Sequence, residues 1–360
     1  MKRLIFALSL GLALVFAGCE KDDDKLVLDV TDKTGYYVLN EGSFGDGNAS
    51  IGFLDSDGTY YDDLFFKTNN RVLGDVLQSI CIDGHTAYLV LNASNKIEIM
   101  NANTFEEKGT IEGFSNPRYM IASNGYGYVS QWGDYSGNGP AVKVIDLSTR
   151  KITKTISTGD GSERMLLSGT NLLVANSGGY GSNNTITVIN TTTNEVSKTI
   201  SLEDNNPMGF VVDKDGSIWV LCFGSVIYSA DYSSIESQTR SALIKLSPTT
   251  FEPLATIAIS ETSHPNQIAI NPAGDIIYYG GGYSFHGIYA VGIDAAEVPS
   301  TPLIDESFYG LSVNPVNGEI AGLLAPSFSQ VGQVIRYQAN GTFIASVNAG
   351  IGPNTALYKN

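Results

Sequence analysis

The chain has 360 residues, enough for a large hydrophobic core, with 39 glycines, 19 tyrosines and only 16% charged residues. Its formal net charge of −16 repels the phosphates of nucleic acids, which argues against nucleic acid as a partner. Long helical stretches rich in Ala, Leu, Glu and Lys are absent, so the composition indicates a folded all-β protein.

The first 18 residues have the order of a secretory signal peptide. Two basic residues precede an apolar run over residues 4–16, and small residues stand just before Cys19. Since this run is shorter than the roughly 20 residues of a membrane span, we do not expect a transmembrane helix. Residues 16–19 resemble the bacterial lipobox, which implies cleavage before Cys19 and lipidation of Cys19. Plain cleavage with an unmodified cysteine is the alternative.

A charged segment follows Cys19. Residues 20–25 read Glu-Lys-Asp-Asp-Asp-Lys, a block that cannot bury apolar surface, so we expect a solvated tether over residues 19–34. A Lys-Asp-Asp run soon after a lipidated cysteine resembles the surface-export signal of Bacteroidetes lipoproteins. The resemblance implies a protein held in the outer membrane by its lipid anchor and exposed on the cell surface.

A unit of four strands recurs along the rest of the chain. Two clear copies place strand-like runs at residues 142–146 and 186–190, each followed by a Lys-Thr-Ile strand. Their alternation of apolar and polar residues and their β-branched content predict strands. A turn glycine marks each unit at intervals of 41 to 58 residues, the spacing of propeller blades. The marks are Gly35, Gly84, Gly125, Gly169, Gly216, Gly274 and Gly318.

These repeats predict an all-β fold, a single β-propeller over residues 35–360 with seven four-stranded blades; six and eight are the alternative counts. The first unit lacks its first strand, and residues 352–358 look like the start of a unit with nothing after it. We therefore expect the C-terminal strand to pair into the first blade, which removes exposed sheet edges. A β-sandwich rarely repeats one unit so often, and a β-helix has shorter coils.

Units with Val-Ile-Asp and Lys-Thr-Ile resemble the YVTN-type propeller repeats. The opening segment at residues 36–45, Tyr-Tyr-Val-Leu-Asn-Glu-Gly-Ser-Phe-Gly, with Phe-Leu-Asp at 53–55, resembles the DUF5074-like surface propeller lipoproteins of Bacteroidetes. That group includes cobalamin-capturing partners of corrinoid transporters, as well as members of unknown ligand. The resemblance implies a surface protein that binds a corrinoid (vitamin B12) and passes it to a TonB-dependent outer-membrane transporter.

Two sets of loops build the ligand-bearing face of a propeller, namely those between the second and third strands and those that lead into each innermost strand. The first set is long in this chain, and long loops on a rigid scaffold are where binding concentrates. Its aromatic residues supply stiff apolar area with hydrogen-bonding groups, although any one of them could simply pin its own loop. The aromatic candidates are Phe44, Trp132, Tyr135, Tyr180, Tyr228, Tyr283, Phe285 and Phe328.

Polar side chains are expected to ring the central channel. Asn and Gln donate and accept hydrogen bonds, which suits a polar ligand rich in amides or hydroxyls. Arg118 and Arg164 could grip a phosphate or carboxylate. The alternative is that the Asn-Pro pairs only shape turns. The polar candidates are Glu41, Asn116, Arg118, Tyr119, Glu163, Arg164, Asn206, Asn266, Gln267, His286 and Tyr309.

Signals for catalysis are weak. The sequence has no GxSxG, HExxH, P-loop or paired-cysteine motif, and its three histidines lack the spaced partners of a metal site. We therefore expect a binding protein without catalytic residues or a cofactor other than a bound corrinoid. A propeller lactonase or lyase using Glu41, Glu163 and His286 is one alternative. A glycan- or protein-binding adhesion scaffold using the Ser- and Tyr-rich insertion at residues 224–242 is another.

Overall fold

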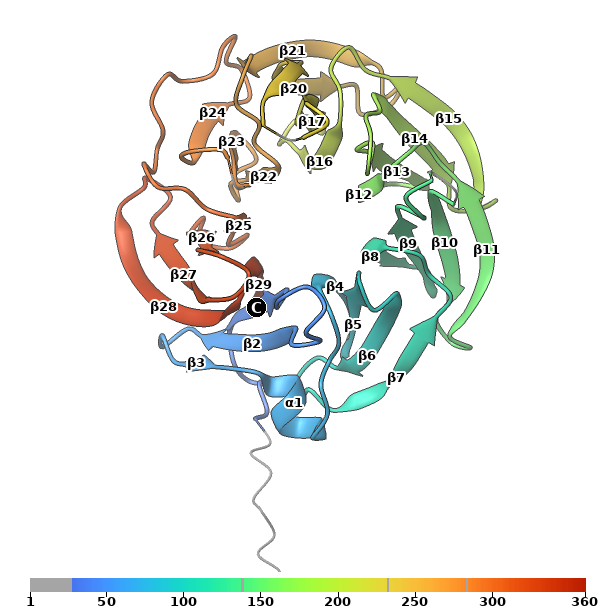
Figure 1. The fold of residues 1–360 in the computed structure, drawn as a ribbon, viewed down its shortest axis with the longest axis vertical. Helices are drawn as coiled ribbons and strands as arrows, with labels where there is room; N and C mark the ends of the chain where they lie inside the picture. The colour runs from blue at the N-terminus through green and yellow to red at the C-terminus, as the bar shows by residue number, and fades with distance from the viewer. Residues whose placement is uncertain (1–27, 137–138, 232, 283) are drawn as a thin grey trace, which may run out of the picture.

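The computed structural model describes residues 28–136, 139–231, 233–282 and 284–360. These residues form seven blade sheets in a ring around a central channel (Figure 1). The prediction of an all-β, seven-bladed propeller is confirmed. The expected signal peptide, Cys19 and most of the expected tether lie outside the described residues. Among the described residues no helix is long and apolar enough to cross a membrane.

Blades 1 to 4 each have four antiparallel strands, in the following order from the channel outward. Blade 1 contains β29 (Pro353–Lys359), β1 (Gly35–Asn40), β2 (Ser50–Asp55) and β3 (Tyr60–Tyr61), followed by helix α1 (Leu64–Asn69). Blade 2 contains β4 (Leu77–Asp83), β5 (Thr86–Leu91), β6 (Lys96–Asn101) and β7 (Glu107–Glu112). Blade 3 contains β8 (Pro117–Ser123), β9 (Tyr126–Gln131), β10 (Ala141–Asp146) and β11 (Lys151–Ser157). Blade 4 contains β12 (Ser162–Ser168), β13 (Asn171–Asn176), β14 (Thr185–Asn190) and β15 (Glu195–Ser201).

Blades 5 and 6 depart slightly from this pattern, and blade 7 follows it. Blade 5 contains β16 (Pro207–Val212), β17 (Ile218–Cys222), β20 (Ser241–Leu246) and β21 (Pro253–Ser260), and its insertion forms the hairpin β18 (Val226–Tyr228) and β19 (Ile235–Gln238). Blade 6 contains β22 (Gln267–Ile270), β23 (Ile276–Gly280) and β24 (Tyr289–Gly292). A single bridge between Ile288 and Ile304 stands in place of its fourth strand. Blade 7 contains β25 (Gly310–Val313), β26 (Ile320–Leu324), β27 (Val331–Tyr337) and β28 (Phe343–Ile351).

The C-terminal strand closes the ring. β29 pairs antiparallel with β1, in a register that sets Tyr36 opposite Tyr358 and Gly35 opposite Lys359. The expected closure is therefore confirmed, because the innermost strand of blade 1 comes from the end of the chain. Without β29, the hydrogen-bonding edge of β1 would face the channel unpaired.

Apolar runs within the strands follow from blades that pack face to face. In β13, residues Leu172 to Ala175 are all fully buried. Successive side chains of a strand point to opposite faces, so Leu172 and Val174 pack in the core shared with blade 3. Leu173 packs in the core shared with blade 5. A strand covered on both faces therefore reads as continuously apolar in the sequence.

Six of the seven marker glycines lie in the turn between the first and second strands of their blades. Each has a positive φ, from 57° at Gly84 to 84° at Gly216, a conformation that favours glycine. The expectation of a turn at Gly35 is wrong, because the preceding strand of blade 1 is supplied by the C-terminus. Gly35 begins β1 instead, where a Cβ atom would lie 2.3 Å from the carbonyl oxygen of Leu54.

The described end of the expected tether packs against the propeller. Val30 is fully buried in the core shared by blades 1 and 2, and its N–H donates to the carbonyl oxygen of Asn103 at 3.1 Å. This contact fixes where the N-terminal segment leaves the domain.

Candidate functional site

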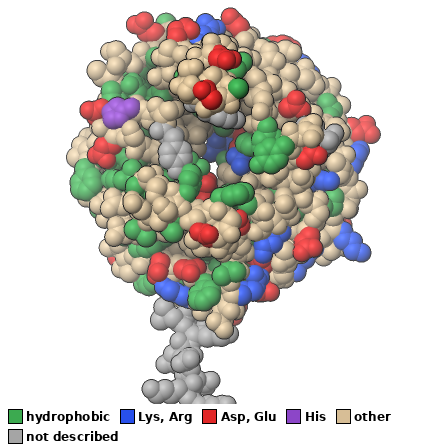
Figure 2. Space-filling view, in the orientation of Figure 1, with side chains coloured by type: hydrophobic (Ala, Val, Ile, Leu, Met, Phe, Trp, Pro, Cys, Tyr) green, Lys and Arg blue, Asp and Glu red, His purple; other side chains and the backbone are tan. Residues whose placement is uncertain are grey.

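The loop face is hollowed at its centre, over the channel. Figure 2 shows hydrophobic side chains around this hollow and charged side chains within it. A groove of about 660 Å³ crosses the loops of blades 3 to 6, and a hollow of about 60 Å³ lies in the channel mouth beside it. Met208 and Asn266 line both spaces, so the groove opens directly onto the channel.

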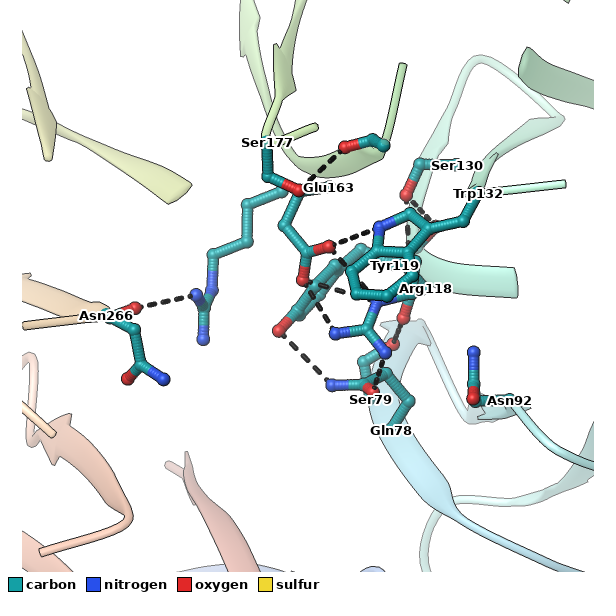
Figure 3. A network of polar contacts seen from close by, with 12 residues as sticks. Gln78, Ser79, Asn92, Arg118, Tyr119, Ser130, Trp132, Glu163, Ser177 and Asn266 are labelled. Atoms are coloured by element: carbon teal, nitrogen blue, oxygen red, sulfur yellow. Dashed lines mark hydrogen bonds and ion pairs between the residues drawn. The ribbon is translucent and has the colours of Figure 1, made fainter. Parts of the chain in front are cut away.

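An ion pair between blades 3 and 4 organises one side of the channel mouth. Arg118, on β8, donates from Nη2 and Nε to Glu163, on β12, at 3.0 Å and 3.1 Å (Figure 3). Arg118 also donates to Gln78 on β4. Burial alone would lower the pKa of Arg118, but the charge and hydrogen bonds of Glu163 raise it above its usual value. The expected grip of Arg118 on a ligand is therefore already taken by a protein carboxylate.

An aromatic cluster covers this ion pair. The indole of Trp132 lies over the guanidinium of Arg118, with 4.2 Å between the guanidinium carbon and the ring centroid, and its N–H donates to Glu163 at 2.7 Å. Tyr180 packs edge-on against Trp132 at 5.4 Å between centroids, and Tyr135 lies on Tyr180 at 4.1 Å. Tyr135 is 81% exposed, so the cluster ends in an open aromatic surface. The sequence predicted all three residues, and the structure brings them together.

Arg164 spans the channel mouth from blade 4 to blade 6. Its Nη2 donates to Oε1 of Gln267 at 2.6 Å, and its Nη1 donates to the carbonyl oxygen of Asn266 at 3.3 Å. The guanidinium lies over the ring of Tyr119 at 4.8 Å. Gly209 of blade 5 permits this crossing, because a Cβ atom there would lie 3.0 Å from Cδ of Arg164.

Glu41 forms a second buried acidic centre on the blade 1 side. Its carboxylate accepts from Nδ2 of Asn354 at 2.8 Å and from the hydroxyl of Tyr309 at 3.1 Å. Burial raises the pKa of Glu41, and the Asn354 hydrogen bond and the charge of Arg118 offset this only in part. Burial, together with the charge of Glu41, also raises the pKa of Tyr309, so its hydroxyl remains protonated and able to donate well above neutral pH.

Two asparagines of the predicted set serve their own loops. Asn116 and Asn206 have φ values of 49° and 55°, a left-handed conformation that asparagine tolerates in turns. The Asn116 side chain donates to the carbonyl oxygen of Gly133 at 2.7 Å, and that of Asn206 accepts from the N–H of Asn183 at 3.0 Å. The turn-shaping alternative accounts for these contacts, although Asn206 also lines the groove.

Other predicted residues lie away from the channel mouth. Phe285 does not belong to the exposed aromatic surface that the sequence predicted, because its side chain is only 5% exposed and packs in the core against Tyr279 and Tyr289. His286 lies at the rim of blade 6, where it contacts Asp305 and Ser307. The remaining aromatics are distributed over the loop face, except Tyr283, which lies outside the described residues: Phe44 is exposed on blade 1, Tyr228 lies on the blade 5 hairpin, and Phe328 packs edge-on against Tyr309.

Four further residues line the channel mouth or the groove. Gln78 and Asn354 line the channel mouth, and both lie at the start of innermost strands, as Arg118 and Glu163 do. This shared place in the repeat is the signal that marks them as channel-lining residues. His264 and Gln238 line the groove and are joined at 3.2 Å between Nε2 and Oε1. Nothing local in the sequence pairs these two, since Gln238 belongs to the insertion.

The three groups weighed for catalysis do not converge. Glu41 and Glu163 line the channel mouth, but His286 is 62% exposed and paired with Asp305 outside it. Both carboxylate oxygens of Glu163 already accept hydrogen bonds from Arg118 and Trp132. Over the described part of the chain, no group of three or more His, Cys, Asp or Glu side chains could hold a metal ion.

Comparison with known families decides the affiliation of this propeller. The profile of the family described as "Domain of unknown function (DUF5074)" matches residues 34–352, from just before β1 to just before β29. The chain belongs to the DUF5074 family. No curated protein matches this DUF5074 chain significantly.

Solved structures show how widely this fold occurs. A quinonprotein alcohol dehydrogenase-like protein from Bacteroides thetaiotaomicron VPI-5482 has 18% identity and a TM-score of 0.67, covering 91% of this DUF5074 chain and 78% of its own. A Bacteroides fragilis NCTC 9343 protein provisionally named a 6-phosphogluconolactonase has 12% identity and a TM-score of 0.65, covering 92% and 99%. Hydrazine synthase of Kuenenia stuttgartiensis has 17% identity and a TM-score of 0.59, covering 76% and 86%. At these identities the likeness concerns the fold alone.

Proposed function

We propose that this DUF5074 propeller is a surface-exposed outer-membrane lipoprotein that captures a ligand in the groove of its loop face. We further propose that the ligand is a corrinoid, which the protein passes to a TonB-dependent outer-membrane transporter. The observation that carries the binding role is the groove of about 660 Å³, which has an aromatic wall at Trp132 and Tyr180 and opens onto an amide-rich channel mouth. Its volume falls within the range of small-molecule sites, about 300–1,000 Å³.

The groove has the chemistry expected for a large, flat, hydrogen-bonding ligand. Tyr135, Tyr180 and Trp132 offer ring faces for stacking, while Asn206, Asn266 and Gln238 offer amides (all line one groove or its rim). A corrin ring is flat and edged with amide groups, so both features would be used. The choice of a corrinoid and of a transporter rests on the resemblance of residues 36–45 and of the segment after Cys19 to Bacteroidetes surface lipoproteins.

The hydrolytic alternative has less support. A metal-dependent lactonase needs several acidic or histidine side chains around one point, and in the described residues Glu41 and Glu163 are engaged with other partners. The adhesion alternative draws on the blade 5 hairpin, where Ile227 and Ile235 are about half exposed. Both of these residues also line the groove, so the same exposure serves ligand capture.

Isothermal titration of the full-length protein in detergent with cyanocobalamin tests the proposal. We expect one-to-one binding at micromolar concentration or tighter, with the ligand recovered unchanged. Tyr135→Ala should weaken binding about tenfold, since aromatic contacts contribute roughly 1–3 kcal/mol when a ring stacks on a flat ligand. Tyr126→Ala is the matched control, because Tyr126 is exposed on the same blade at the opposite face. Absence of heat in the wild type would refute the corrinoid assignment.

A further inference from the structure

Arg164 carries a charge that forms no ion pair with any group of the described structure. Four arginines of the described chain form ion pairs within 4.0 Å, among them Arg118, but Arg164 is not one of them. Its two acceptors, Gln267 Oε1 and the carbonyl oxygen of Asn266, are both neutral. A guanidinium has five N–H donors, so three of those on Arg164 have no protein acceptor in the described structure. A half-buried cation in this state favours an anion supplied from outside.

Two residues that line the same hollow each have a buried side-chain oxygen that lacks a donor in the described structure. The side-chain oxygens of Asn266 and Asn354 are buried and accept no hydrogen bond in the described structure. Both residues line the channel mouth together with Arg164. A buried acceptor without a donor costs free energy, so a bound group that brings N–H or O–H donors would stabilise this arrangement. The channel mouth therefore favours an anionic ligand that also carries its own hydrogen-bond donors.

The neighbouring acids do not fulfil this role. Glu163 is bound to Arg118 and Trp132, and Glu41 is bound to Tyr309 and Asn354. Arg164 is held in place by its stacking on Tyr119 and by its bonds to blade 6, so its remaining donors are positioned before any ligand arrives. Preorganised guanidinium groups of this kind bind a phosphate or carboxylate through two parallel N–H···O hydrogen bonds.

We propose that Arg164 forms an anion subsite at the channel mouth, which receives a phosphate or carboxylate group flanked by hydroxyl or amide donors. This inference deepens the proposed ligand-binding role, on which its place in the groove rests. A phosphate ester of a hydroxylated sugar has both features, as does a hydroxy acid. The bulk of the ligand then lies in the groove while its anionic end reaches Arg164.

Two simple anions test the subsite without any assumption about the full ligand. The melting temperature of the full-length protein is measured with rising inorganic phosphate or acetate, at an ionic strength kept constant with chloride. We expect saturable stabilisation by at least one of the two anions, and the better one identifies the class. Arg164→Gln should weaken the apparent affinity about tenfold or more, as expected for losing charge-assisted hydrogen bonds. The control is Arg150→Gln, an exposed arginine that also lacks an ion-pair partner in the described chain.

A pair of corrinoids separates this inference from the proposed function. Cyanocobalamin carries a ribose phosphodiester, and dicyanocobinamide lacks it. We expect the wild type to prefer cyanocobalamin and Arg164→Gln to lose about tenfold of that preference. Anion stabilisation through Arg164 without corrinoid binding would support the subsite and overturn the corrinoid proposal. Corrinoid binding with equal affinity in wild type and Arg164→Gln, and no anion effect, would overturn the subsite and leave the proposed function standing.

Discussion

Arg118 and Glu163 link two neighbouring blades at the mouth of the channel through an ion pair with 3.0 Å between Nη2 and Oε1. The side chain of Glu163 is 1% exposed and that of Arg118 is 15% exposed, so the pair is shielded from water. The indole of Trp132 lies over it and bonds to the same carboxylate. The ion pair therefore holds β8 against β12 at the inner edge of the ring, and it supports the aromatic wall of the groove through Trp132.

Replacing Glu163 should destabilise the propeller. Glu163→Gln keeps the shape but leaves the Arg118 charge without its partner, and we expect a loss of about 3 kcal/mol in the free energy of unfolding, measured by urea titration. Glu195→Gln is the control, since Glu195 pairs with Lys154 at 3.7 Å and is 72% exposed, and a surface pair contributes under about 1 kcal/mol. Equal losses in the two variants would contradict a buried, structural pair.

Glu41 should make stability depend on pH. Burial raises its pKa in the folded state above the ordinary value of 4.5, so the folded protein binds this proton more tightly than the unfolded chain does. The stabilisation from this group is present below pH 4.5 and is lost as pH rises through the folded pKa.

Glu41→Gln removes this dependence. We expect its melting temperature to exceed that of the wild type by about 1–3 °C at pH 7.5, with the difference shrinking as pH falls toward 4.5. Gln can still accept from Asn354 and Tyr309, so the geometry is retained. Parallel melting curves for the two proteins over the whole pH range would show that the Glu41 proton is not linked to folding.

The C-terminal strand should be required for folding. Deleting residues 353–360 removes β29, exposes the edge of β1, and breaks the bond from the Ala356 N–H to Ser312 of blade 7. We expect a loss of more than about 5 kcal/mol and aggregation through the open edge, seen by circular dichroism and gel filtration. Deleting Asn360 alone is the control, because this residue is exposed and lies beyond the strand. A monomeric, cooperatively folded deletion product would disprove this account of closure.

Two glycines of blade 4 allow the cost of backbone strain to be distinguished from the cost of a steric clash. Gly161 and Gly169 both have positive φ, at 68° and 60°. A Cβ atom on Gly161 would lie 1.9 Å from the backbone nitrogen of Gly179, whereas one on Gly169 would meet nothing within 4 Å. We expect Gly169→Ala to cost about 1–2 kcal/mol and Gly161→Ala clearly more, by urea unfolding.

Gly161→Ala should also displace the loop that carries Tyr180, and so weaken ligand binding. Gly169→Ala lies in a turn at the opposite face and should leave the affinity unchanged. If the two variants bound ligand equally well, the close approach of Gly161 to Gly179 would not position the groove.

Much of the fold could be read from the repeats because a blade is a local structure. Its four strands follow one another along the chain, so apolar runs and turn glycines such as Gly84 and Gly169 recur with a fixed spacing. The closure of the ring was also readable, because the first unit lacks its innermost strand and the end of the chain supplies a strand with no unit of its own. Gly35 was the exception. The repeat spacing predicted a turn there, on the assumption that blade 1 begins like the others.

The sequence by itself determined the repeating four-stranded blades, the closing strand and the face on which Trp132, Tyr135 and Tyr180 lie, because each follows from the order of strands and loops. The structure decided the count of seven among the six, seven or eight that the repeats allowed. Only the tertiary structure decided what the charged residues do. Arg118 and Glu163 occupy the same place in successive repeats and pair with each other. Arg164, one position later in its repeat, crosses over Gly209 to blade 6 and keeps donors without an acceptor among the described residues. The physical reason is that the partner of each arginine is set by contacts between blades, and the repeat spacing carries no information about which side chains of different blades meet.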